Sequence, residues 1–329
     1  MRWRDPDWLE EASVWIRERV GEPAGAIEQP HVQPWSTVLR VPTDDGPLFF
    51  KANGPYSHFE AALDDELARS FPDLVGEVVA VDTERGWLLL RDAGTRLREL
   101  EPGPEQLVCW EQLLPRYAEL QIALGERADE LRSLGVPDLP LADLPARFEE
   151  LLDDEAALRP GTDDDLTEDE LERLRAAGQE VASLCEELAS VGVPESLQHD
   201  DLHDGQVFIR DGCHRILDWG DSCVTHPFHT LVVTLRVLAY KHGFQPGGTA
   251  LERVRDAYLE PFTLASPRAD LVAAAGLAHR TGTLGRSLAW YGYVRARHET
   301  VDPDDAASVP YGLKLFLRDG PPGSWDPAA

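Results

Sequence analysis

A polar stretch in the second half of the chain, from His199 to Gln206, reads HDDLHDGQ and gathers two imidazoles, three carboxylates and one amide. These side chains are compatible with a zinc site, an acid–base pair or a solvated turn before a strand. Zinc requires imidazoles that converge on one point, as two histidines one turn apart on a helix do. His199 and His203 instead precede a glycine and an apolar segment, without an obvious third ligand. The pattern therefore favours carboxylate chemistry over zinc.

A further acidic residue, Asp218, lies in the segment RILDWGDS. The residues before it, VFIRDGCHRILDW, predict a β-hairpin that turns at Asp211 and Gly212. Two carboxylates flanking a hairpin, with the amide of Gln206 between them, provide hard oxygen ligands for Mg²⁺ and one carboxylate for an attacking hydroxyl. The step of five residues from Asp201 to Gln206 equals the step from the catalytic aspartate to the metal-binding asparagine of protein kinases.

Lysine is rare in this chain, because it occurs only at positions 51, 241 and 314, and arginine fills the other strongly basic positions. A lone lysine among arginines indicates a position that needs a compact point charge. Lys51 ends the apolar run LFFK, which follows TVLRV and a turn at residues 42–47. This pattern predicts a hairpin with Lys51 on its second strand. From the hairpin alone, an ordinary strand-end lysine is an equally good interpretation.

The elements around Lys51 predict a small α+β unit. Residues 58–71 have an apolar helical stripe, with Glu60 and Glu66 on its two borders, so that either glutamate is able to face inward. Two more strands, at VVAV and WLLL, follow before Gly94. Beyond Gly94 the pattern becomes helical, with long apolar periodicity in residues 106–124 and 171–191. We therefore expect two domains, residues 1–94 and residues 95–329.

At this point the sequence resembles the aminoglycoside phosphotransferase and choline kinase-like family of small-molecule kinases. The loop of that family usually reads His-Gly-Asp-Leu-His-Pro-Gly-Asn, and its metal aspartate lies in a segment such as Ile-Asp-Trp. The matching residues here are His199, Asp201, Leu202, His203, Gly205 and the segment Leu217-Asp218-Trp219. The resemblance implies an α+β, protein kinase-like, two-lobed fold. The small N-lobe has an antiparallel sheet and one helix, and the larger C-lobe is mainly helical.

The resemblance also implies roles for single residues in ATP- and Mg²⁺-dependent transfer of phosphate to a hydroxyl of a small molecule. Asp201 is the catalytic aspartate, and Gln206 and Asp218 are the metal ligands. Lys51 holds the nucleotide phosphates, with Glu60 as its helix partner. Because the chain lacks G-x-G-x-x-G, the segment QPWSTVL around Ser36 and Thr37 is expected to cover the phosphates. Adenine is expected between the lobes, against backbone groups near Leu90 to Asp92.

Three positions of the loop depart from the pattern of the family. Asp200 replaces the usual glycine and Asp204 the usual proline, and both add negative charge. Gln206 replaces asparagine, so its amide must bend back by one methylene to meet the strict geometry of Mg²⁺. Further along, THP and HTL at residues 225–227 and 229–231 stand where the family tends to have Gly-Asp-Pro and an aspartate before leucine.

Composition limits the partners of this chain. A net charge of −29 disfavours nucleic acid and anionic lipid. An acidic surface suits a cationic partner such as an aminoglycoside or amino sugar, and it equally suits general solubility. No run of about 18 apolar residues predicts a membrane span. The N-terminus is charged and predicts an amphipathic helix with Asp5 as its N-cap, not a signal peptide, so we expect a cytoplasmic protein.

Two other functions remain open from the sequence. The first is a pseudokinase that binds nucleotide without transfer, which the change at Gln206 and the charge at Asp200 motivate. The second is a metal-dependent hydrolase that uses His199, His203 and Asp201. The sequence leaves open the identity of the acceptor, the choice between ATP and GTP, the choice between Glu60 and Glu66, and the oligomeric state.

Overall fold

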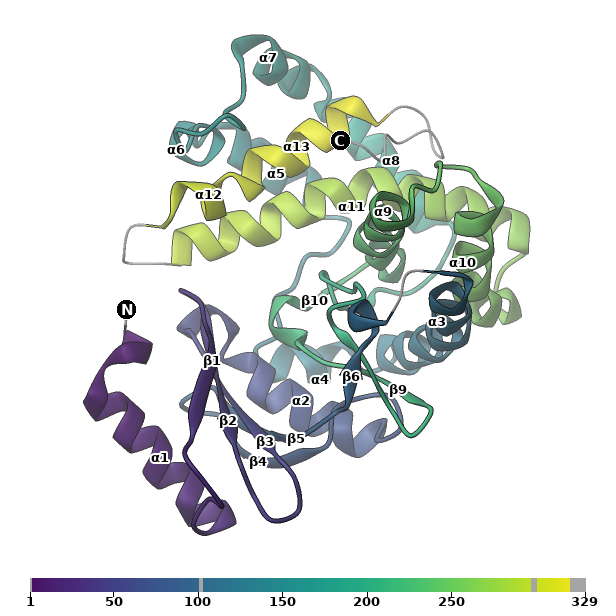
Figure 1. Ribbon diagram of the computed structural model, residues 1–329. Helices are drawn as coiled ribbons and strands as arrows, with labels where there is room; N and C mark the ends of the chain where they lie inside the picture. Colours follow the sequence, from purple (N-terminus) through teal and green to yellow (C-terminus); the bar gives the residue numbers. More distant parts are fainter. Residues whose placement is uncertain (1, 101–102, 297–300, 320–329) are drawn as a thin grey trace. The chain divides into compact units, whose positions relative to one another are not determined.

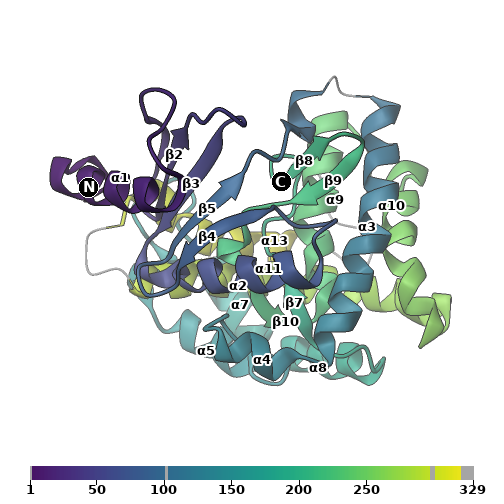
Figure 2. The ribbon, with the colours of Figure 1, turned by 90° about the horizontal axis from the view of Figure 1, so that it is seen from below.

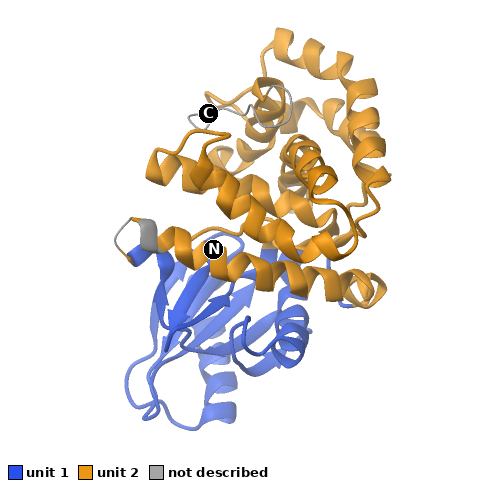
Figure 3. Ribbon diagram, turned by 90° about the vertical axis from the view of Figure 1, so that its right-hand side faces the viewer, with its two compact units in different colours: residues 1–99, 134–136, 205–220 blue, residues 100–133, 137–204, 221–329 orange. Residues whose placement is uncertain are grey.

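The structure is a computed structural model that describes residues 2–100, 103–296 and 301–319. It has an α+β fold and divides into two compact units, coloured separately in Figure 3. Unit 1 contains residues 1–99, 134–136 and 205–220, and unit 2 contains residues 100–133, 137–204 and 221–329. The domain boundary expected at residue 94 stays a prediction.

A five-stranded antiparallel sheet forms the centre of unit 1, with the strand order β1-β2-β3-β5-β4. The hairpin expected around Lys51 is present, since residues 36–41 pair with residues 48–53. A second, three-stranded sheet contains β6, β8 and β9. The elements of unit 1 are α1 (Pro6–Val20), β1 (Glu28–Val32), β2 (Ser36–Val41), β3 (Leu48–Asn53), α2 (Phe59–Ser70), β4 (Val78–Asp82), β5 (Trp87–Arg91), β6 (Thr95–Arg96), β8 (Val207–Arg210) and β9 (Cys213–Ile216).

The two faces of this sheet have different coverings, because side chains alternate along each strand. One face carries Phe50 and Trp87, whose rings pack against Trp15 of α1 with centroid separations of 5.5 and 5.8 Å. The other face carries Leu88, which packs with Ala61 of α2. Figures 1 and 2 show α1 and α2 on opposite sides of the sheet. The alternation therefore directs Lys51, next to Phe50 in β3, toward the side of α2.

The ends of α1 and of the β8–β9 hairpin follow the sequence signals. Asp5 is the N-cap of α1, and its carboxylate accepts a hydrogen bond from the backbone N–H of Asp7. The hairpin turns at Asp211 and Gly212, which both have positive φ angles, of 53° and 77°. This backbone geometry is the one that a two-residue hairpin turn requires.

Unit 2 is mainly helical, and its longest helix, α11, contacts α5, α8, α9, α10 and α13. A short antiparallel ladder joins β7 and β10. No helix in the described part of the chain is long and apolar enough to cross a membrane. The elements of unit 2 are α3 (Pro104–Gly125), α4 (Ala128–Ser133), α5 (Leu144–Leu152), α6 (Glu155–Leu158), α7 (Glu168–Ala176), α8 (Gly178–Ser190), β7 (Ser196–Gln198), β10 (Cys223–Thr225), α9 (Thr230–His242), α10 (Thr249–Leu259), α11 (Arg268–Ala296), α12 (Pro303–Ala306) and α13 (Ser308–Arg318).

Candidate functional site

Lys51 lies between two carboxylates of unit 1. Its Nζ is 2.7 Å from Oε1 of Glu60 and also forms an ion pair with Oδ1 of Asp218. Glu60 is fully buried in the first turn of α2, whereas the side chain of Asp218 is 49% exposed. Glu66, the alternative partner, instead accepts hydrogen bonds from Arg69 and Ser70. The structure therefore brings Lys51, Glu60 and Asp218 together and leaves Glu66 outside this cluster.

Both carboxylates stabilise the charge of Lys51, whereas Asp218 and Glu60 repel each other. Burial acts to lower the pKa of Lys51, but Asp218 and Glu60 outweigh it and raise the pKa. Burial raises the pKa of Glu60, and the attraction of Lys51 opposes this effect. Lys51 therefore remains protonated at neutral pH. Its ammonium is a fixed positive charge beside the half-exposed carboxylate of Asp218.

Two residues near Glu60 did not emerge from the sequence. Asp64 follows one turn later on α2 and is 3% exposed, and its Oδ1 has no hydrogen-bond partner among the described residues. Burial, followed by the charge of Glu60, raises the pKa of Asp64 well above its usual range. Gly220 lies against Glu60, because a Cβ at this position would be 2.9 Å from Oε2 of Glu60. The (i, i+4) spacing from Glu60 to Asp64 is the sequence signal for this second acid.

The loop with Asp201 is anchored within unit 2. The backbone N–H of Asp201 donates to Nδ1 of His199, which is fully buried, at 3.3 Å. Nε2 of His203 is 3.3 Å from Oδ2 of Asp201. The hydroxyl of Thr234, on α9, donates to the carbonyl oxygen of Leu202 at 2.7 Å. His199 therefore holds the backbone of Asp201, and His203 contacts its carboxylate.

Arg286 on α11 contacts both aspartates at the start of this loop. Its Nη2 is 3.0 Å from Oδ1 of Asp201, and its Nη1 donates to the backbone carbonyl of Asp200. The carboxylate of Asp200 is 3.8 Å from Nη1. Sequence reasoning missed Arg286, because no motif links α11 to the loop.

Asp204, at the other end of the loop, forms an ion pair with Lys241 of α9. Lys241 is the second of the three lysines, so the rarity of lysine was a usable signal for this contact. Each of the two acidic departures from the family pattern therefore has a basic partner in unit 2.

Backbone strain is concentrated in this part of the sequence. Within the described ranges, the residues other than glycine with positive φ are Asp200, Asp211 and Asp218, with φ angles of 62°, 53° and 69°. Asp211 belongs to the hairpin turn, but Asp200 and Asp218 belong to the two acidic motifs. Strained residues of this kind persist where the surroundings hold them, and they cluster at functional sites.

Gln206 lies in unit 1, directly before β8. Its backbone carbonyl accepts a hydrogen bond from the backbone N–H of Leu217 at 3.0 Å, and this bond links it to the segment that holds Asp218. Gly205, the residue before it, leaves room for the guanidinium of Arg98, which a Cβ would overlap. The loop thus brings Gln206 close in the fold to the residue that precedes Asp218.

The residues expected to contact the nucleotide differ in burial and in hydrogen bonding. Ser36 and Leu90 are buried within β2 and β5. The hydroxyl of Thr37 donates to the carbonyl of His31 at 2.7 Å, so it serves the β1–β2 hairpin. The carbonyl of Asp92 accepts a hydrogen bond from Arg210 at 2.7 Å. The nucleotide contacts of Ser36, Leu90 and Asp92 stay predictions.

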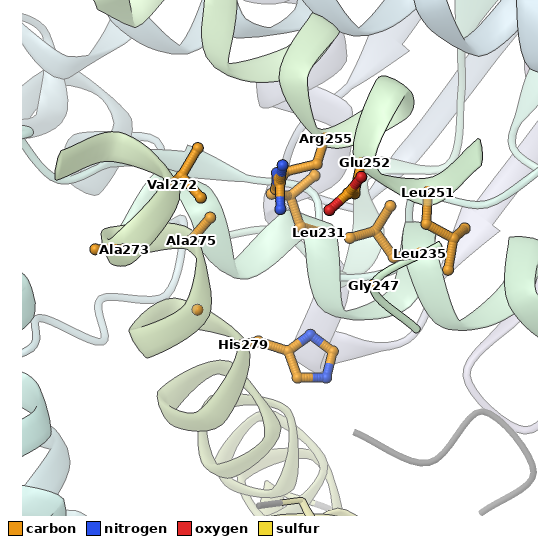
Figure 4. A pocket seen from close by; sticks show the side chains of 11 residues that line it. Leu231, Leu235, Gly247, Leu251, Glu252, Arg255, Val272, Ala273, Ala275 and His279 are labelled. Atoms are coloured by element: carbon orange, nitrogen blue, oxygen red, sulfur yellow. The ribbon is translucent and has the colours of Figure 1, made fainter. Parts of the chain in front are cut away.

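Unit 2 also contains a hollow of about 240 Å³ between α9, α10 and α11 (Figure 4). Its wall is mostly apolar, with Leu231, Leu235 and Leu251, and its polar side chains are Glu252, Arg255 and His279. None of the residues assigned from the sequence lines this hollow.

Comparison with known proteins gives the context of these residues. The sequence model of the phosphotransferase enzyme family (APH) matches residues 31–270, which include Lys51, Asp201 and Asp218. The chain belongs to the APH phosphotransferase family. It is therefore a small-molecule kinase, a phosphotransferase with an alcohol group as acceptor, and APH enzymes use ATP. A search of curated proteins found no significant match.

Solved structures with a similar fold confirm the expected protein kinase-like architecture of the APH family. A choline/ethanolamine kinase family protein from Mesorhizobium loti has 17% identity and a TM-score of 0.60, with 94% of each chain covered. An ethanolamine kinase from Plasmodium vivax has 11% identity and a TM-score of 0.62, covering 95% of this chain and 90% of that one. A macrolide 2'-phosphotransferase from Brachybacterium faecium has 18% identity and a TM-score of 0.58, covering 92% and 97%.

The hydrolase alternative was wrong, because the chain belongs to a family of phosphotransferases. Across residues 2–100, 103–296 and 301–319, no group of three or more histidine, cysteine, aspartate and glutamate side chains is arranged to hold a metal ion. His199 and His203 instead form the contacts with Asp201 described above.

Proposed function

We propose that this APH-family enzyme transfers the γ-phosphate of ATP to a hydroxyl of a small molecule such as an aminoglycoside or amino sugar, with Asp201 as its catalytic residue. The observation that carries the proposal is the cluster of Lys51, Glu60 and Asp218 in unit 1. A buried carboxylate holds a protonated lysine beside a second, half-exposed carboxylate. Protein kinases use an arrangement of this kind, in which the lysine binds phosphate oxygens and the outer carboxylate binds the metal that joins them.

The residues present fit Mg²⁺ and the phosphates of a nucleotide. Asp218 offers carboxylate oxygens that are accessible. Gln206, whose backbone is hydrogen-bonded to Leu217, would supply its amide oxygen as a further hard ligand. Mg²⁺, when bound, neutralises the charge that develops on the phosphate oxygens. Lys51 binds the phosphates, and Glu60 holds the ammonium of Lys51 in place.

Asp201 has the role of orienting the acceptor hydroxyl. The transition state of phosphoryl transfer is usually loose, so the carboxylate need not deprotonate the alcohol early. It accepts a hydrogen bond from the hydroxyl and takes its proton late in the reaction. The contacts of Asp201 with His203 and Arg286 hold the carboxylate in one orientation for this task.

The charge around Asp201 bears on the choice of acceptor. Arg286 balances part of the negative charge of the loop, so the acidic composition of the chain does not by itself demand a cationic acceptor. The similar structures include proteins named for choline, ethanolamine and macrolides. The acceptor set for a test therefore comprises aminoglycosides, amino sugars, macrolides, choline-like alcohols, neutral sugars and nucleosides.

The test measures ATP consumption with each acceptor, in the wild type and in Asp201→Asn. We expect one class of acceptor to stimulate turnover, and we expect Asp201→Asn to abolish it while ATP affinity stays within about threefold. Asp211→Asn is the matched control, since Asp211 is an exposed aspartate of the β8–β9 turn. An Asp201→Asn enzyme with most of its activity would remove Asp201 from the reaction. Mg²⁺-dependent ATP binding without turnover on any acceptor would favour the pseudokinase.

A further inference from the structure

Arg286 connects the two consecutive aspartates of the loop through a single side chain. One of its terminal nitrogens contacts the carboxylate of Asp201, and the other contacts both the carbonyl and, at 3.8 Å, the carboxylate of Asp200. The donors of a guanidinium have a fixed planar arrangement. A change in the position of Arg286 relative to Asp200 therefore changes the hydrogen bond that Asp201 receives.

Asp200 is buried and has a strained backbone, and both features destabilise the fold. It is 7% exposed, and its φ of 62° lies in the left-handed region, which glycine adopts freely and aspartate does not. Its Oδ1 accepts a hydrogen bond from the side chain of Gln198 at 3.1 Å, and its Oδ2 faces Arg286. Glycine is the residue that the backbone here favours, so the aspartate side chain requires a separate reason.

We infer that Asp200 is a positioning residue, whose carboxylate holds the guanidinium of Arg286 so that Arg286 fixes the carboxylate of Asp201 toward the acceptor hydroxyl. This inference rests on the proposed function and deepens it. It assigns a task to one of the three residues by which the loop departs from the family pattern.

The contact between Asp200 and Arg286 depends on pH, because it requires the charged form of Asp200. Burial raises the pKa of Asp200 to about 6, and Arg286 opposes this effect. Among the described residues, the other titratable groups that face Asp200 are Asp201, Cys223 of β10 and Tyr117 of α3. Asp221 faces Arg286, and His203 faces Asp201. Burial raises the pKa of Cys223 and of Tyr117, so both stay uncharged in this range. Below about pH 6 Asp200 becomes neutral, and Arg286 loses its attraction.

The first test is independent of turnover. Carbon-13 NMR of aspartate carboxyl carbons follows Asp200 and Asp201, which Asp200→Asn and Asp201→Asn assign by loss of one signal each. In a His203→Gln background, which removes the imidazole that contacts Asp201, we expect the Asp201 signal to shift with a midpoint near the pKa of Asp200. We expect this shift to disappear in Asp200→Asn and in Arg286→Gln of the same background. An Asp201 signal with no such inflection, or one that keeps it in Asp200→Asn, would overturn the inference.

The second test measures turnover with the acceptor that the ATP-consumption screen identifies. We expect Asp200→Gly to lower kcat about tenfold at about pH 8, with little change in KM for ATP, although it relieves the strained backbone and does not lower Tm. The ratio of wild-type to Asp200→Gly kcat should shrink toward one as Asp200 becomes neutral. Asp211→Gly is the control, since it relieves the same kind of strain in an exposed turn and should leave kcat unchanged. A wild-type kcat for Asp200→Gly would contradict the positioning role.

The two proposals fail in different ways. If no acceptor supports ATP turnover, the proposed function is wrong. The NMR titration still decides whether Asp200 sets the contact between Arg286 and Asp201. Turnover that depends on Asp201 but not on Asp200 would keep the function and refute the inference.

Discussion

Lys51 owes its properties to two carboxylates that differ in exposure. Glu60 is buried and has no access to a ligand, so its task is to hold the ammonium of Lys51. Asp218 is half-exposed and is able to exchange Lys51 for another cation. The sequence identified Lys51 from the rarity of lysine. Periodicity alone left Glu60 and Glu66 as equal candidates, because both border the apolar stripe of α2, and the family resemblance favoured Glu60. In the structure, the packing of α2 places Glu60, and not Glu66, beside Lys51.

The first prediction concerns these partners. Lys51→Ala should weaken ATP binding and turnover together, on the order of 100-fold in kcat/KM, because it removes a charge from the phosphates. Glu60→Gln should lower kcat/KM by roughly tenfold, since it only positions the lysine. Glu66→Gln is the matched control on the same helix and should behave as the wild type. Steady-state kinetics with ATP as the varied substrate check these values, and a larger effect of Glu66→Gln than of Glu60→Gln would reverse the assignment.

The second prediction concerns Gln206, whose side chain is one methylene longer than that of asparagine. If its amide oxygen is a metal ligand, it must lie about 2.1 Å from Mg²⁺, and the loop must be set back to accommodate the longer side chain. We therefore expect Gln206→Asn to lower activity, although it restores the usual residue of the family, and Gln206→Ala to lower it further. Magnesium titrations of turnover for the three proteins measure this. An alanine variant with an unchanged titration would show that Gln206 does not bind metal.

Local sequence patterns predicted the strands and the hairpins of unit 1, but they did not predict the contact of Arg286 with Asp201. The hairpin of residues 36–53 and the β8–β9 turn follow from alternation and from turn residues a few positions apart. Arg286, which contacts the carboxylate of Asp201, is 85 residues away in the sequence, on a helix without a motif. Contacts of this kind depend on how helices pack, so no local pattern reveals them.

The helix expected over residues 171–191 illustrates the same limit. The apolar periodicity continues through the whole segment, but the structure divides it into α7 and α8 at Ala177. The φ and ψ angles of Ala177 are −83° and −2°, which lie outside regular α-helix, and Gly178 follows. Apolar periodicity indicates which residues face the core, but it does not indicate where one helix ends and the next begins.

The third prediction concerns the segment between β5 and β6. Gly94 has a φ of 96°, and a Cβ there would overlap the carbonyl oxygen of Ile209 in β8. Because that oxygen belongs to a strand backbone, it is not free to move aside. Gly94→Ala should therefore lower the free energy of unfolding by about 3 kcal/mol.

Gly46→Ala provides the matched control for this change. Gly46 has a φ of 105° in the turn between β2 and β3, with nothing within 4 Å of the added Cβ. Gly46→Ala should lower the free energy of unfolding only by the backbone strain, about 1 kcal/mol. Urea denaturation of both variants measures the difference, and equal losses would show that the contact with Ile209 relaxes.

The fourth prediction belongs to the whole molecule, whose 60 acidic and 31 strongly basic residues give a net charge of −29. Such a charge opposes the compact state through self-repulsion. Raising NaCl from about 10 mM to about 100 mM shortens the Debye length from roughly 30 Å to roughly 10 Å. We expect Tm to rise on the order of 5 °C, because screening weakens the repulsion. Equal effects of NaCl and KCl would exclude specific ion binding, and a fall in Tm would show that ion pairs dominate.

The order in which the chain contributes to its two units limits how the protein can be divided. Unit 1 takes residues 205–220 from the second half of the sequence, and they include β8, β9 and Asp218. A fragment that ends near residue 99 would leave β6 without its partner strand and Lys51 without one of its two carboxylates. Expression of the N-terminal third alone should therefore yield an aggregating or protease-sensitive fragment. Adding residues 205–220 as a separate peptide offers a route to a split-protein reporter built on reassembly of the β6–β8 pair.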